Sequence, residues 1–186
     1  MPTNKDVENQ QSYIDLAMRT ASSQYYGDEI PEADLAYTLS PIIEFGNSLD
    51  DIKKALFYGR DLDLFRRNRG SGRKLNNART AFHDTKSTGA MIFHGLLGVI
   101  TEAVELAELL ESTVIDKKPF DAVNLKEELG DIFWYMAILA KTMNFTFEEI
   151  QHANIEKLKL RFPEKFTEAA ANNRNLDAER KLLEGE

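Results

Sequence analysis

The chain has 186 residues, of which 42% are hydrophobic and 29% charged, with no cysteine and a formal net charge of -8. This composition is typical of one globular domain. It excludes disulfides and thiolate metal sites, and it argues against a protein that coats nucleic acid, because phosphate binding depends on Lys and Arg. The N-terminal stretch lacks the apolar core of a signal peptide, and the longest apolar run, 132–140, is about half of a membrane span. We therefore expect a cytoplasmic protein with no membrane and no stable nucleic-acid partner.

The first third of the chain predicts helices and offers almost no strand signal. Apolar residues recur at helical spacing over 6–22, and two shorter helices are expected over 31–46 and 49–59, each ending near a glycine. The stretch 44–63 loosely resembles 102–121, which indicates either a degenerate duplication or chance similarity between two amphipathic helices. An all-α fold follows from this pattern.

A basic stretch rich in Arg, Asn, Gly, Ser and Thr follows at 65–89. Loops of this length inside a compact domain are uncommon and often functional. A solvated flexible segment is one interpretation. A lid that closes over a bound anion through Arg73 or Lys74 is a second, and a surface for RNA or a protein partner is a third.

The second half of the chain carries the strongest helical pattern. A helix is expected over 90–112, and Asn124 with Glu127 resembles a capping box that opens a second helix ending near 142. Thr146 and Glu149 form a cleaner capping box for a third helix that stops before Pro163, and a short charged helix is expected over 176–183. The first two of these helices are apolar nearly all round, so they need burial on several sides. Dimerisation into a shared helical bundle would supply that burial.

Two acidic pairs interrupt the apolar helices: Glu102 with Glu105, and Glu128 with Asp131. Residues three apart lie on one face of a helix, so the pairs could meet across an antiparallel helix–helix groove. Four converging carboxylates would repel one another, and a divalent cation would remove that penalty. Oxygen-only ligands favour Mg²⁺ or Mn²⁺.

Two other interpretations would also account for these acids. A ferritin-like di-iron site requires Glu-x-x-His pairs, which neither helix offers. A solvated face would also explain the first pair, because Glu105 is followed at the same spacing by Glu108 and Glu111. The second pair, beside a long apolar run, is what favours a metal site.

A polar stripe of Asn154, Lys157 and Arg161 lies on the third helix. Facing a metal cluster, these groups would suit a polyphosphate, since Lys and Arg bind the oxygens that the metal leaves. The alternative is a solvated basic face, because Lys159 and Lys165 lie close by in the sequence.

Three sequence stretches together resemble a known family. GLLGVITEAVELAELL, VNLKEELGDIFWYMAILA and ANIEKLKLRFPEKF are similar to the MazG-like members of the all-α nucleoside triphosphate pyrophosphohydrolase superfamily. Dimeric dUTPases and phosphoribosyl-ATP pyrophosphohydrolases are more distant relatives. The resemblance covers about 90–184, and the tail is similar to that of longer, often phage-encoded, members. Where many relatives have Gly between the first two acids, this chain has Val104, which would tighten helix packing locally.

The resemblance implies a helical bundle of the MazG and dimeric-dUTPase type, completed as a homodimer or homotetramer. It divides the chain into an N-terminal helical segment (1–65), whose first helix can belong to the bundle, a basic loop or linker (66–89), and a catalytic core with its C-terminal tail (90–186). It also implies Mg²⁺-dependent hydrolysis of a dNTP or NTP to a monophosphate and pyrophosphate, with Mn²⁺ as a substitute. Other activities left open are hydrolysis of dUTP alone, phosphoribosyl-ATP or an alarmone, and a non-catalytic nucleotide-binding module.

By the same resemblance, residues are assigned as follows. The catalytic and metal-binding residues are Glu102, Glu105, Glu128 and Asp131, with one of these or Glu127 orienting the attacking water. The substrate-binding residues are Asn154, Lys157, Arg161, His94 and Trp134. A structural role for His94 and a core position for Trp134 and Tyr135 are the alternatives.

Overall fold

The computed structural model describes residues 12–22, 27, 30–60 and 86–185, with 86–88 as backbone only. Every element within these ranges is an α-helix, which confirms the predicted all-α class. The helices are α1 (Tyr13–Met18), α2 (Glu32–Tyr58), α3 (Lys86–Val114), α4 (Ala122–Met143), α5 (Phe147–Arg161), α6 (Glu168–Asn172) and α7 (Leu176–Glu184). The predicted basic loop lies outside the described residues up to position 85.

The chain divides into two compact units. One unit comprises residues 27–144 and contains α2, α3 and α4. The other comprises residues 1–26 with 145–186 and contains α1, α5, α6 and α7. The predicted N-terminal segment 1–65 is thus shared between the two units, with α2 in the first and α1 in the second.

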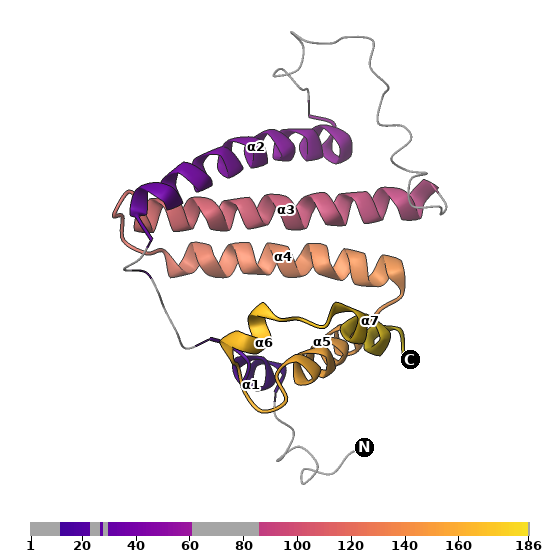
Figure 1. The fold of residues 1–186 in the computed structure, drawn as a ribbon. Helices are drawn as coiled ribbons and strands as arrows, with labels where there is room; N and C mark the ends of the chain where they lie inside the picture. Colours follow the sequence, from indigo (N-terminus) through magenta and orange to yellow (C-terminus); the bar gives the residue numbers. More distant parts are fainter. Residues whose placement is uncertain (1–11, 23–26, 28–29, 61–85, 186) are drawn as a thin grey trace, which may run out of the picture. The chain divides into compact units, whose positions relative to one another are not determined.

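In the first unit α3 lies between α2 and α4 (Figure 1). Its residues 89–114 are long and apolar enough, by length and composition alone, to cross a membrane. The same pattern is expected of a core helix with neighbours on two sides. Leu97, Val104 and Leu109 are buried in this arrangement.

The helix α2 is continuous over 27 residues, so the prediction of two helices, 31–46 and 49–59, was wrong at the break between them. Gly46 does not end a helix there. It is buried, and a Cβ at this position would lie 2.3 Å from Cγ2 of Val104. The glycine therefore provides space for a side chain of α3. The helix ends at Gly59, whose positive φ of 70° suits a residue without a Cβ.

The caps of α4 and α5 test two predictions about helix starts. Asp121, rather than Asn124, caps α4: its side chain accepts hydrogen bonds from the backbone N–H groups of residues 123 and 124. The predicted Asn124–Glu127 capping box was wrong, because the Asn124 amide donates instead to Glu128. The Thr146–Glu149 capping box of α5 is confirmed.

A glycine also sets the approach of α3 to α4. A Cβ on Gly98 would lie 2.0 Å from the ring of Tyr135, which is 5% exposed. No small movement relieves such an overlap with a buried aromatic ring. This contact therefore fixes how closely the two helices carrying the acidic residues can pack.

We expect Gly98→Ala to lower the free energy of unfolding by about 1–3 kcal/mol through overpacking, even though alanine favours helices. Gly130→Ala is the matched control, because it lies in α4 and a Cβ there would meet nothing within 4 Å. It should be neutral or stabilise by up to about 1 kcal/mol. Urea unfolding of both variants measures the difference, and equal stability of the two would contradict the packing described here.

Candidate metal centre

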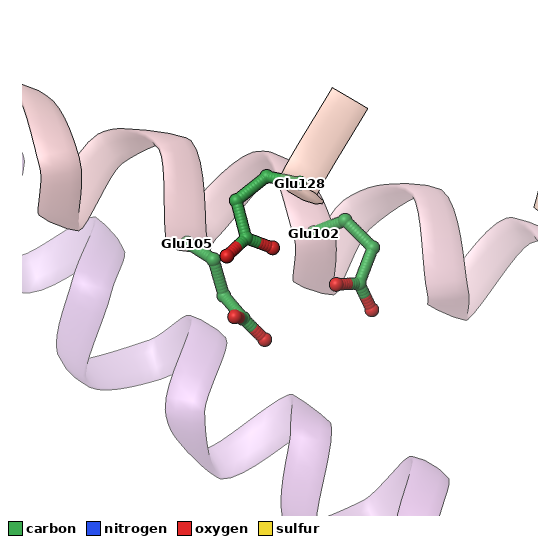
Figure 2. Close-up of side chains that lie close together, drawn as sticks. All are labelled: Glu102, Glu105 and Glu128. Carbon is green, nitrogen blue, oxygen red and sulfur yellow. The ribbon is translucent and has the colours of Figure 1, made fainter. Parts of the chain in front are cut away.

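Three carboxylates from two helices converge in the first unit. Glu102 and Glu105 of α3 and Glu128 of α4 each offer one oxygen, and these oxygens all lie within 4.8 Å of one another. Figure 2 shows the three carboxylates pointing into one space. Glu102 and Glu128 are 5% and 4% exposed, and Glu105 is half-buried. The structure thus brings together three of the four acids that the spacing predicted.

Glu102 is held by a buried lysine of α2. The Lys53 ammonium donates to Oε1 of Glu102 at 3.0 Å and to the Thr101 hydroxyl at 2.6 Å, and it lies 3.1 Å from Asp50. Burial alone would lower the pKa of Lys53, but its hydrogen bonds with Glu102 and Asp50 outweigh burial and raise that pKa. Lys53 and Asp50 were missed by the sequence reasoning.

Glu128 is held by its own helix. Asn124, one turn earlier, donates from Nδ2 to Oε1 of Glu128 at 2.6 Å. Burial raises the pKa of Glu128, and the charge of Glu102 adds to this, while the bond from Asn124 opposes it. Two of the three acids therefore have a fixed partner that orients one oxygen.

Glu105 lies close to both other acids. Burial, followed by the charges of Glu128 and Glu102, raises its pKa to about 7. A carboxyl with this pKa holds a proton near neutral pH unless a cation enters. Three close oxygen donors without nitrogen or sulfur match the donor set of a hard divalent ion. The residues present therefore fit Mg²⁺ or Mn²⁺.

Asp131 is not among the acids that the structure gathers. Its side chain is exposed, and it lies outside the group of three. Glu127, named as a candidate for orienting water, is also exposed. The metal-binding role of Asp131 stays a prediction.

The space beside the acids is accessible. Glu105 and Glu128 line a cavity of about 360 Å³ at the end of the α3–α4 pair. Its remaining lining residues are Glu108, Leu109, Ser112, Lys118, Pro119, Asp121 and Asn124. Because acids dominate this lining, the cavity favours a cation, or an anion that arrives with one.

His94 and Trp134 belong to an aromatic cluster. His94 is 8% exposed and stacks on Phe57 with ring centroids 4.1 Å apart, and burial lowers its pKa. The Tyr58 hydroxyl lies 3.4 Å from its Nε2. Trp134 is 52% exposed, which contradicts a core position, whereas Tyr135 is in the core as predicted.

The predicted substrate-binding residues of α5 belong to the second unit. Arg161 makes two hydrogen bonds, of 2.8 and 2.6 Å, to the carboxylate of Glu179 in α7. Arg161 and then Arg174 lower the pKa of Glu179 to about 2. Asn154 accepts a hydrogen bond from the Tyr13 hydroxyl at 3.3 Å, and Lys157 is half-buried. Their contacts with a substrate stay a prediction.

Comparison with known proteins identifies one family. Residues 95–166 match the family model described as the MazG nucleotide pyrophosphohydrolase domain, which confirms the resemblance over that range. No curated protein and no solved structure shows significant similarity to the chain. The matched range contains all three gathered acids and the polar stripe of α5.

The pKa of Glu105 predicts how the metal-free protein responds to pH. Because its folded pKa of about 7 lies above its ordinary value of 4.5, the folded protein binds this proton more tightly than the unfolded chain. The stability that the proton contributes is complete below about pH 4.5 and is lost as pH rises through 7. We expect Tm in EDTA to fall between pH 5 and pH 8, and Glu105→Gln to reduce that fall. An identical fall in both proteins would contradict the raised pKa.

Proposed function

From the match of residues 95–166 to the MazG nucleotide pyrophosphohydrolase domain, we propose that the chain hydrolyses nucleoside triphosphates between the α- and β-phosphates. The substrates are dNTPs or NTPs, and the products are a nucleoside monophosphate and pyrophosphate. The observation that carries this proposal is the convergence of Glu102, Glu105 and Glu128 within 4.8 Å. Phosphoryl transfer depends on charge neutralisation and positioning more than on covalent chemistry by the protein.

We propose that the three acids hold Mg²⁺, with Mn²⁺ as a substitute. A bound divalent ion would supply charge for the phosphate oxygens and lower the pKa of a water. The protein supplies fixed ligands: Lys53 and Asn124 each hold one oxygen, on Glu102 and Glu128. This leaves the second oxygen of each of those two carboxylates for the ion.

We propose that Glu105 would accept the proton of the attacking water through the carboxylate oxygen that the ion does not use, since the group of three needs one oxygen from each acid. Lys53 anchors Glu102 and Asn124 anchors Glu128, whereas burial, followed by the charges of Glu128 and Glu102, raises the pKa of Glu105. A carboxylate whose pKa lies near neutral can accept a proton from water within hydrogen-bond reach. Glu127, which is exposed next to Glu128, is the alternative for this role.

The proposed substrate contacts rest on the sequence motif inside the matched range. Lys157 and Arg161 would bind phosphate oxygens, and Asn154 would bind phosphate or sugar. Trp134, with half of its surface exposed, offers a ring on which a base can stack. His94, which stacks on Phe57 and contacts the Trp134 ring edge-on, would help to hold that ring in place.

We propose a cytoplasmic homodimer or homotetramer. Large apolar side chains are exposed on all three helices of the first unit, including Phe45 at 72% and Phe133 at 56%. Exposed apolar surface of this extent marks interaction sites in soluble proteins. A second copy of the chain would cover these residues within a shared bundle.

A nucleotide panel tests the proposed activity. We expect pyrophosphate release from at least one dNTP or NTP with Mg²⁺, and none in EDTA. Glu102→Gln and Glu128→Gln should each lower kcat by about 100-fold or more, because each removes an oxygen donor and a charge from the centre. Glu111→Gln is the control, since Glu111 lies in α3 outside the centre and bonds to Ser40. Nucleotide binding without turnover in the wild-type protein would instead indicate a binding module.

Asp131 requires a separate test. It lies one turn after Glu128 on α4, and an exposed side chain can rotate toward an ion that the other acids already hold. We expect Asp131→Asn to lower kcat at least tenfold and to leave Tm in EDTA within about 2 °C of the wild-type value. Unchanged kcat at limiting Mg²⁺ would remove Asp131 from the ligand set.

A further inference from the structure

Lys53 is the one charged residue from α2 that the structure buries against the acids. It is 3% exposed, and its ammonium touches three groups: Oε1 of Glu102 at 3.0 Å, the Thr101 hydroxyl at 2.6 Å and Asp50 at 3.1 Å. The ammonium also lies 5.0 Å from the centroid of the Tyr135 ring. A lysine with this many partners is fixed in place.

The neighbouring Lys54 shows what an ordinary lysine does on the same helix. It pairs with the other oxygen of Asp50, and its side chain is 37% exposed. Exposed pairs of this kind contribute little to stability. Lys53 differs because its ion pair with Glu102 is buried on both sides, with side chains 4% and 7% exposed. Removing one member of such a pair leaves an uncompensated buried charge.

The position of Lys53 has two consequences for Glu102. Both Lys53 and Thr101 reach Oε1, which fixes the orientation of the Glu102 carboxylate beside Glu105 and Glu128. The ammonium also places a positive charge 3.0 Å from one oxygen of Glu102, a carboxylate that would bind the cation. At such distances inside a protein, like charges repel by more than they do in water.

We propose that Lys53 is a positioning residue with a built-in positive charge, which holds Glu102 in its ligand orientation and weakens the affinity of the centre for a divalent ion. This proposal rests on the proposed metal centre, but not on which nucleotide is hydrolysed. Lys53 offsets part of the acid cluster's charge in the metal-free protein. The same charge opposes the entry of a free ion.

Manganese binding provides a test that is independent of activity. In Glu102→Gln, Lys53 keeps its charge but loses its main anionic partner, so Mn²⁺ should bind more weakly than to the wild-type protein. Adding Lys53→Met to that variant removes the buried charge, and we expect the double variant to bind Mn²⁺ about tenfold more tightly than Glu102→Gln alone. Lys54→Met in the same background is the matched control and should change the affinity by less than about twofold.

Calorimetric titration with MnCl₂ gives the affinities. Equal or weaker Mn²⁺ binding by the double variant relative to Glu102→Gln would overturn the proposal, as would an equal gain from Lys54→Met. The double variant removes both members of the buried pair and so leaves no uncompensated charge from it. Mn²⁺ affinities of Glu102→Gln and of the double variant can therefore be compared even if Lys53→Met alone does not fold.

The positioning role is tested separately on turnover. Lys53→Met should lower kcat at saturating Mg²⁺ while KM for the nucleotide changes by less than about twofold, because Lys53 would touch a ligand and not the substrate. Lys53→Arg, which keeps the charge, should restore part of kcat. An unchanged kcat, or a rise in KM alone, would contradict the positioning role. Absence of pyrophosphate release in the wild-type protein would end the proposed function, while the Mn²⁺ comparison would still decide the role of Lys53.

Discussion

The arrangement of residues 27–144 depends on neutralising three carboxylates that two helices bring within 4.8 Å of one another. Carboxylates buried this closely cannot all remain ionised without positive charge nearby. Three features of the described residues reduce the repulsion between these carboxylates. Lys53 pairs with Glu102, Asn124 donates to Glu128, and Glu105 holds a proton because its pKa is raised to about 7. A divalent ion would replace that proton.

The three acids therefore differ in the side chains that hold them. The carboxylates of Glu102 and Glu128 are oriented by side chains from α2 and α4, so their geometry is set before any ligand arrives. Preorganised ligands of this kind are what a centre for phosphoryl transfer requires. Glu105 interacts with the two other acids, and its pKa of about 7 suits the proton-accepting role proposed for it. The asymmetry comes from the neighbours of each acid, because all three residues are the same amino acid.

Three of the four predicted acids lie close together, because the sequence signal that points to them is local. Spacing of three residues on a strongly periodic helix places Glu102 and Glu105 on one face, and the length of the connection brings Glu128 alongside. Lys53 could not be found in this way, because it lies 49 residues from Glu102 and is one of two adjacent lysines on an amphipathic helix. The partner of Arg161 was missed for a similar reason, since Glu179 comes from a separate short helix. Local capping signals were reliable for α5 but misleading for α4, where Asp121, three residues before Asn124, caps the helix.

The contact between Gly46 and Val104 has a consequence for reading related sequences. The Val104 side chain of α3 occupies the space that a side chain at position 46 of α2 would need. The large residue at 104 therefore requires a small one at 46. A relative with glycine between the first two acids would have room for a side chain on the opposing helix. Substitutions at these two positions should therefore be compensatory, so that neither can be interpreted without the other. Val104 lies between Glu102 and Glu105 in the sequence. Paired changes in side-chain size at positions 46 and 104 would therefore keep the spacing of α2 and α3, and with it the positions of the two acids.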